Sequence, residues 1–131
     1  MASRSSLLGD QLRRHRAALE LRAEQSGWGQ PLPAGRARGS AIPESFGSVV
    51  GEVAEVSMRG GLPRVRRLVA VIDCGIAVNP QMIAGQIESA ANHGLSAAPY
   101  GEITFADGKA QQVNFDTYQV LRINEAPMVE A

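Results

Sequence analysis

At residues 46–57 the chain reads FGSVVGEVAEVS, and at residues 64–73 it reads RVRRLVAVID. Both stretches are rich in β-branched residues, which favour extended strands. Between them, MRGGLP at 58–63 holds a glycine pair and a proline, the residues of a chain reversal. Together the three stretches predict an antiparallel β-hairpin.

Two helices are expected, one before and one after this hairpin. Residues 81–98 follow Asn79, whose side chain is placed to cap a helix, and Pro80, which suits the first helical position. Residues 7–25 carry leucines and alanines at a fair helical period, separated by arginines and glutamates, and Gly27 is expected to end that helix. The second of these helices is the better delimited element.

A second hairpin is expected after the second helix. Residues 100–105 and 109–115 flank Asp107-Gly108, a dipeptide that tolerates the positive φ angles of a tight primed turn. The tail that follows has no convincing pattern of its own, although Met128-Val129 is expected to begin a further strand.

This order of elements predicts an α+β fold, with two antiparallel hairpins and both helices packed on one face of the sheet. We divide the chain into an N-terminal helix at residues 1–27, an irregular loop rich in glycine, proline and arginine at residues 28–45, and a ββαββ core at residues 46–131. A structureless loop of that length is either functional or packed onto something outside this chain.

The composition is that of one small globular domain: the 131 residues are 44% hydrophobic and 20% charged. No window approaches the roughly 20 consecutive apolar residues of a membrane span, and residues 1–9 lack the apolar core of a secretory signal. We therefore expect a soluble, cytoplasmic protein with no membrane partner. A single cysteine excludes an intramolecular disulfide and a multi-cysteine metal or iron–sulfur site.

The formal charge is zero but unevenly spread. Residues 1–67 hold 11 basic and 6 acidic side chains, a net +5, whereas residues 68–131 hold 2 and 7, a net −5. These halves are expected to attract each other. The basic residues are not interleaved with aromatic ones as a nucleic-acid surface requires, so we do not expect nucleic acid as a partner. A third hypothesis is an anion-binding surface formed by Arg13, Arg14, Arg16, Arg36 and Arg38.

Catalytic and metal-binding groups are sparse. Cys74 and His93 form one conceivable thiol–imidazole pair, but no nucleophile motif surrounds Cys74, which is expected to be a small buried side chain at a strand end. His15 lies among arginines and is expected to be solvated. Glu52 and Glu55, three apart on a strand, are expected to point to opposite faces and not to share a metal ion. We assign no catalytic residue and no metal ligand.

Gly85-Gln86, in the first turns of the second helix, is the candidate cofactor-binding site. Gly85 has no side chain and would let a flat heterocycle approach the helix. Gln86 has an amide that donates and accepts hydrogen bonds at once, as the amide-like edge of a pterin requires. A helical glutamine taken alone is a solvated residue, so the wider sequence context decides between the two readings.

That context comes from three strings: Ile72-Asp-Cys-Gly-Ile-Ala-Val-Asn-Pro80, Gly85-Gln-Ile-Glu88 and Gly94-Leu-Ser-Ala-Ala-Pro-Tyr-Gly-Glu102. Together they resemble the molybdopterin-binding large subunit of the xanthine oxidase and aldehyde oxidoreductase family, most closely of the isoquinoline 1-oxidoreductase beta-subunit type. The resemblance runs from about residue 10 to residue 129, nearly the whole chain.

The resemblance implies part of an oxidoreductase that hydroxylates N-heterocycles or aldehydes with a molybdenum–molybdopterin cytosine dinucleotide cofactor. It implies as partners a 2Fe–2S small subunit and complementary segments of the large subunit. A family glutamine that contacts the pterin corresponds to Gln86, next to Gly85.

The family's catalytic glutamate lies in a Gly-Glu-Pro-Gly motif, and this sequence has no such string. We therefore expect an internal fragment of the large subunit that is not catalytic alone. The alternative is a non-enzymatic α+β interaction module that associates with itself as a homo-oligomer.

Overall fold

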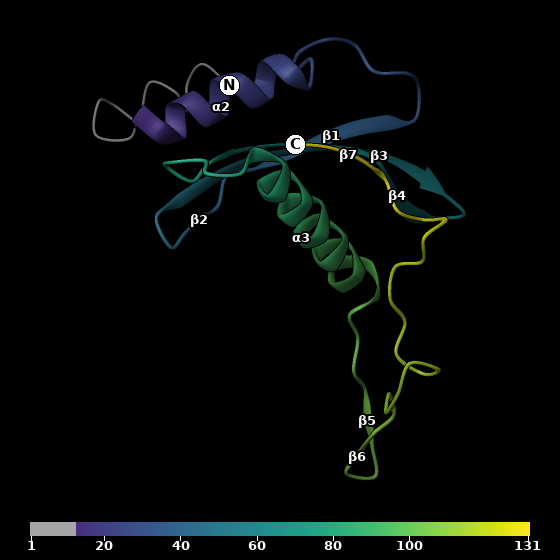
Figure 1. The fold of residues 1–131 in the computed structure, drawn as a ribbon. Helices are drawn as coiled ribbons and strands as arrows, with labels where there is room; N and C mark the ends of the chain where they lie inside the picture. Colours follow the sequence, from purple (N-terminus) through teal and green to yellow (C-terminus); the bar gives the residue numbers. More distant parts are fainter. Residues whose placement is uncertain (1–12) are drawn as a thin grey trace.

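The computed structural model describes residues 13–131 (Figure 1). Its elements are α2 (Arg13–Gln25), β1 (Arg36–Ala41), β2 (Glu44–Ser45), β3 (Ser48–Arg59), β4 (Leu62–Asp73), α3 (Pro80–Tyr100), β5 (Phe105–Ala106), β6 (Lys109–Ala110) and β7 (Met128–Glu130). The expected α+β class is confirmed. Of the expected first helix, residues 7–12 lie outside the described residues, and the rest is α2.

The β3–β4 hairpin is confirmed, and β4 begins earlier than expected. The two strands pair antiparallel from Val49 opposite Asp73 to the end of the hairpin. Gly60 and Gly61 have φ angles of 59° and 80°, the left-handed values that a two-residue primed turn needs. β3 begins at Ser48 because the two residues before it also have positive φ and form a second tight turn.

The prediction that residues 28–45 form an irregular loop is wrong for much of the segment, because it contains β1 and β2. β1 pairs antiparallel with β3 from Arg36 opposite Ser57 to Ala41 opposite Glu52, and β2 pairs with the start of β3. The sequence of β1 is poor in β-branched residues, so its extended form comes from hydrogen bonding to the long edge of β3. Only residues 28–35 and the short turns remain irregular.

The strand order is β1-β3-β4-β7, with β2 also beside β3. The strand expected at Met128-Val129 is confirmed as β7, which lies parallel to β4 with Arg67 opposite Met128 and Val69 opposite Glu130. β7 covers only three residues of the outer edge of β4, so Ala70 to Asp73 have no strand partner there within the described chain.

α2 covers one face of the sheet. Its Ala18 and Leu19 are buried, and so are Val49 and Val53 of β3 and Val69 of β4. Along β3 burial alternates strictly from Ser48 to Val56, the pattern of a strand with one covered face. This face forms the small apolar core.

α3 lies on the opposite side of the sheet from α2 (Figure 1), so the expectation that both helices share one face is wrong. In β4 four consecutive residues, Leu68 to Val71, are buried, which means that both faces of this strand are covered. The continuous apolar run from Leu68 to Ile72 was the sequence signal for this arrangement, since a one-sided strand alternates.

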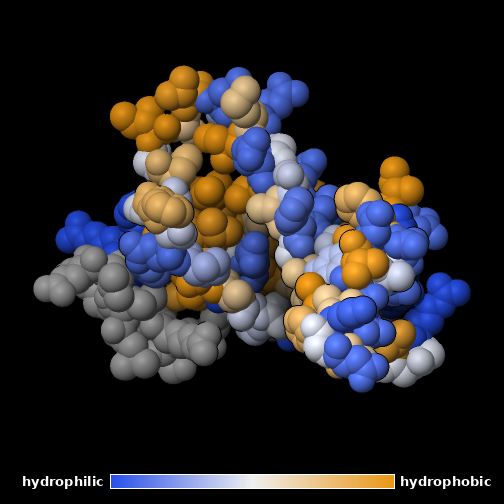
Figure 2. Space-filling model, turned by 90° about the horizontal axis from the view of Figure 1, so that it is seen from below, coloured by the Kyte–Doolittle hydropathy of each residue, from blue (hydrophilic) through white to orange (hydrophobic). Residues whose placement is uncertain are grey.

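The end of α3, β5, β6 and the tail up to residue 127 form an arm that extends away from the sheet and returns to β7 (Figure 1). The expected turn at its tip is confirmed, with φ angles of 51° at Asp107 and 73° at Gly108, but each strand of that hairpin has only two residues. Viewed from below, the arm points toward the reader and apolar side chains are exposed on this side of the molecule (Figure 2).

Within residues 13–131, three ion pairs join the basic half of the chain to the acidic half, in agreement with the expected attraction. Arg14 binds Asp73 at 2.7 Å, Arg67 binds Glu130 at 2.6 Å, and Arg64 binds Glu125. Each pair closes a long loop of the chain: they attach α2 to the end of β4, β7 to β4, and the arm to the start of β4. The opposite charges of the two halves thus form ion pairs that connect elements of the fold.

Candidate functional site

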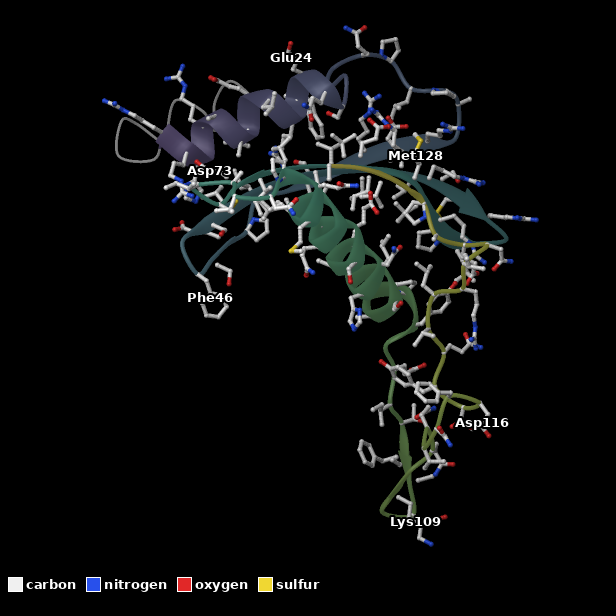
Figure 3. The ribbon with its side chains drawn as sticks, in the orientation of Figure 1. Glu24, Phe46, Asp73, Lys109, Asp116 and Met128 are labelled. Atoms are coloured by element: carbon white, nitrogen blue, oxygen red, sulfur yellow. The ribbon has the colours of Figure 1, made fainter. Side chains whose placement is uncertain are left out.

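The turn between β4 and α3 is anchored by Asp73, which lies beneath the start of α2 (Figure 3). Arg14 donates from Nε to Asp73 Oδ2 at 2.7 Å and from Nη2 to Oδ1 at 2.9 Å. The backbone N–H of Gly75 donates to Asp73 Oδ1 at 3.0 Å, and Gly75 has a φ of 82°. A bidentate guanidinium and a local Asx contact therefore fix the path of the chain into α3.

These contacts stabilise the charged form of the carboxyl group. The hydrogen bonds from Arg14, together with the one from the Gly75 N–H, lower the pKa of Asp73 from 3.8 to about 2. The same hydrogen bond with Asp73 raises the pKa of Arg14. The pair is ionised over the whole physiological range.

α3 starts as expected from its capping residues. Asn79 Oδ1 accepts a hydrogen bond from the Met82 N–H at 3.1 Å, and Pro80 occupies the first turn. This cap satisfies one of the N–H groups that the first turn leaves without an intrahelical partner. The prediction of a helix capped by Asn79 is confirmed, and the helix runs two residues further than expected.

Gly85 and Gln86 lie in the second turn of α3, and both are exposed. A Cβ atom built on Gly85 would meet no atom within 4 Å. Helical spacing places Met82, Gly85, Gln86 and Ser89 on one stripe of α3 (i, i+3, i+4, i+7). The stripe presents one amide beside open space, which fits one edge of a flat heterocycle. α3 contains no lysine or arginine, so it offers no cation for a phosphate group.

A pocket of about 410 Å³ lies on another side of α3, along the open edge of β4. Leu21 of α2, Ala70 and Ile72 of β4, and Ile83 and Ile87 of α3 contribute apolar side chains to it. Cys74 also lines this pocket and is half-buried. Ile83 and Ile87 are one turn apart on the face of α3 directed away from Gly85, so the pocket and the Gly85-Gln86 stripe are on different faces of the helix.

The structure does not bring Cys74 and His93 together. Cys74 precedes α3, whereas His93 is exposed on its fourth turn, about 20 Å along the helix axis from the first turn. His15 is not solvated as expected: its side chain is half-buried, and its Nε2 lies 2.9 Å from Glu44 Oε2. Across residues 13–131 no cluster of three or more histidine, cysteine or carboxylate side chains is placed to hold a metal ion.

Two buried charged residues were not predicted as important. Arg22 is 1% exposed, and its Nη1 donates to the backbone oxygens of Ala41 and Glu52 at 2.6 and 2.9 Å. Glu55 is 7% exposed. It lies on the face of the sheet opposite to that of Glu52, as predicted from their separation of three residues along one strand. The spacing of Ala18 and Leu19 from Arg22 (i+4, i+3) was the signal that Arg22 lies on the buried face of α2.

The arginines that suggested an anion-binding surface are engaged within the fold. Arg38 donates to Glu55 Oε1 at 2.9 and 3.1 Å and to the backbone oxygen of Gly27 at 2.7 Å. Arg14 also donates to the backbone oxygen of Gly47, in addition to Asp73. Arg67 approaches the same Glu55 oxygen at 3.5 Å. Arg14 and Arg38 thus hold the fold together.

One further property concerns the helices. Within the part of the chain that the structure describes, neither helix combines the length and the apolar character needed to cross a lipid bilayer.

Comparison with known proteins places the chain in a family. The family model of the molybdopterin cofactor-binding domain matches residues 10–127. Isoquinoline 1-oxidoreductase subunit beta from Brevundimonas diminuta is 31% identical over 65 residues, which are 50% of this chain and 8% of that subunit.

Two solved structures share the fold: Cu,Mo-CO dehydrogenase in its carbon monoxide reduced state, and reconstituted CO dehydrogenase from Oligotropha carboxidovorans. Each has a TM-score of 0.59 and 23% identity, and the match covers 63% of this chain and 11% of the other. The chain thus spans about a tenth of the length of these relatives. Because the family model covers most of its residues, the chain belongs to the family of molybdopterin cofactor-binding domains.

Proposed function

We propose that the chain forms part of the large subunit of a molybdenum-dependent oxidoreductase that hydroxylates N-heterocycles or aldehydes. The observation that carries this proposal is the match of residues 10–127 to the molybdopterin cofactor-binding domain. When bound, the molybdenum cofactor supplies the redox chemistry of such a hydroxylation. The role of this chain is to hold one edge of the cofactor.

Gly85 and Gln86 are the residues that hold that edge in this proposal. Gly85 leaves the surface of α3 open, and Gln86 presents a donor and an acceptor beside it. The cofactor proposed is the cytosine dinucleotide form, whose phosphates need cations that α3 lacks. Complementary segments of the large subunit therefore contribute the phosphate contacts and the catalytic base, and a 2Fe–2S small subunit accepts the electrons.

Exposed apolar residues on the arm support such partners. Phe115 is 80% exposed and Ile123 is 97% exposed, and Phe105 at the arm's tip is also exposed. Apolar side chains gathered on one projecting segment are typical of a surface that packs against protein. The same surface supports the second candidate function, a self-associating interaction module. Sedimentation equilibrium separates the two, because a monomer up to about 100 μM contradicts self-association.

The cofactor-edge assignment is tested by titrating isotope-labelled protein with free pterin and following the Gly85 N–H and the Gln86 side-chain amide by NMR. We expect the variants Gly85→Leu and Gln86→Leu to weaken binding about tenfold, the effect of losing a well-placed hydrogen bond or the open space beside it. The matched controls are Gly94→Leu and Gln81→Leu, the same residue types at exposed positions of α3. Equal affinities in all four variants would contradict the assignment.

The larger proposal is tested by producing the chain in cells that make the molybdenum cofactor. Purified protein is assayed for molybdenum and for heterocycle-dependent reduction of a dye. We expect no activity from this chain by itself, since it lacks the Gly-Glu-Pro-Gly motif, and activity only when the complementary segments and the 2Fe–2S subunit are produced with it. Activity of the complex that persists without this chain contradicts the proposal.

A further inference from the structure

Three arginines gather around a polar pocket at the far end of the β3–β4 hairpin. The pocket has a volume of about 220 Å³, and Arg59, Arg64, Arg66, Asn124 and Glu125 contribute its polar side chains. We propose that this pocket binds a phosphate group, either as free phosphate or as the phosphate of a small organic molecule. The inference is independent of the molybdopterin proposal.

A β-bulge brings the arginines together. Arg67 pairs with Glu55 and Val65 pairs with Val56, so Arg66 is an extra residue of β4 without a partner in β3. Such a bulge twists the strand and redirects its side chains. Arg64 and Arg66 both line the pocket, and Arg59 joins them from the last position of β3.

Two of the guanidinium groups are held in place and keep donors available. Arg64 donates from Nη1 to the Tyr100 hydroxyl at 3.1 Å and to Glu125. Arg66 donates from Nε to Ser57 Oγ at 2.8 Å. Within residues 13–131 these bonds leave Nε and Nη2 of Arg64 and both Nη atoms of Arg66 to donate to a ligand. Guanidinium groups in fixed positions are suited to bidentate contact with phosphate oxygens.

The positive charge of the pocket favours an anionic ligand. Three guanidinium groups face one carboxylate, that of Glu125, which leaves a net charge of +2. Within the described residues Arg59 makes no hydrogen bond or ion pair that would reduce this charge. A phosphate group carries about −1.5 to −2 at neutral pH and matches it. A neutral ligand gains only hydrogen bonds from such a site, whereas a dianion is also attracted by the positive charge.

A neighbouring pocket has room for the organic part of a phosphate-containing molecule. It has a volume of about 440 Å³ and shares Arg64, Asn124 and Glu125 with the first pocket. Leu62 and Tyr100 add apolar surface to it. The site lies near the end of α3, and Tyr100 is about 21 Å along the helix from Gln86.

The test is calorimetric titration of the chain with inorganic phosphate and, separately, with adenosine 5′-monophosphate, at constant ionic strength set with chloride. We expect Arg59→Gln to weaken phosphate binding about tenfold, and the double variant Arg59→Gln/Arg66→Gln to weaken it further, because each removes charge-assisted hydrogen bonds. The control is Arg16→Gln, which removes the same charge from α2. Tighter binding of the nucleotide than of phosphate identifies an organic phosphate, and equal binding identifies free phosphate.

Arg59 is exposed, so its replacement leaves the fold intact, and a thermal melt of each variant checks this. An Arg59→Gln variant that binds phosphate as tightly as the Arg16→Gln control overturns the proposal. Absence of any heat of binding at about 10 mM phosphate, a concentration that reveals even millimolar affinity, overturns it as well.

Discussion

The close approach of α2 to the sheet at Gly51 predicts that Gly51→Ala destabilises the protein. A Cβ atom at Gly51 would lie 2.9 Å from Arg22 Cδ, 3.0 Å from the backbone oxygen of Ala18 and 3.1 Å from Val71 Cγ2. The Ala18 oxygen belongs to a helix backbone, and the Arg22 side chain is fixed by its bonds to Ala41 and Glu52. The helix must therefore shift outward to make room.

The size of the effect follows from two opposing contributions. Overpacking of a well-packed site costs about 1–3 kcal/mol, whereas replacing a strand glycine with alanine returns about 0.5–1 kcal/mol of backbone entropy. The difference between the two ranges is a net loss of about 0–2.5 kcal/mol, centred near 1 kcal/mol. With an unfolding entropy of about 2.1 cal/mol/K per residue, 1 kcal/mol corresponds to about 4 °C for 131 residues. We therefore expect the melting temperature to fall by about 4 °C.

The assay is thermal unfolding followed by circular dichroism. Gly94→Ala is the matched control, because a Cβ there meets no atom within 4 Å and the position is helical. It should raise the melting temperature by about 2–4 °C, since alanine favours a helix over glycine by about 0.8–1 kcal/mol. A Gly51→Ala variant that melts within about 1 °C of the wild type would show that α2 is not packed tightly against this glycine.

Three further predictions concern the charged contacts. Because the pKa of Asp73 is lowered to about 2, its contact with Arg14 stabilises the fold fully above the unfolded pKa near 4 and is lost as the pH falls toward 2; urea titrations should show Arg14→Gln less stable than the wild type at neutral pH, with the gap closing below about pH 4. Arg22→Met should cost about 1–3 kcal/mol in the same assay, since the backbone oxygens of Ala41 and Glu52 lose the guanidinium that donates to them; a loss below about 0.5 kcal/mol would contradict this. Glu125→Gln should speed proteolysis within the arm, because Glu125 attaches it to Arg64; unchanged cleavage would show that the arm is held by other contacts.

Local features of the fold were predictable because they depend on a few neighbouring residues. Asn79 and Pro80 mark the start of α3, and Gly60-Gly61 and Asp107-Gly108 mark turns that require positive φ. Each of these residue types satisfies a backbone requirement at its own position. The assignment of Gly85 and Gln86 to cofactor binding rests on the same kind of local sequence evidence and stays a prediction.

Features that depend on distant contacts were mispredicted or missed. β1 is extended because it pairs with β3, which its own sequence, RARGSA, does not indicate. Arg22 is one of the arginines that separate the apolar residues of the first helix in the sequence, yet it is buried, because backbone oxygens of β1 and β3 accept hydrogen bonds from its guanidinium group. Buried charge is tolerated only where partners are supplied, and these partners are 19 and 30 residues away.

The two helices, the β3–β4 hairpin, the turn at Asp107-Gly108, the strand at Met128 and the charge asymmetry could be read from the amino-acid sequence, because backbone preferences and side-chain identities are local properties. Contacts between distant segments set which face of the sheet each helix covers, and they leave Gly85 and Gln86 of α3 exposed. The tertiary structure also gathers three arginines in one pocket through the bulge at Arg66. These depend on strand register and helix packing, which are set by contacts between segments far apart in the chain.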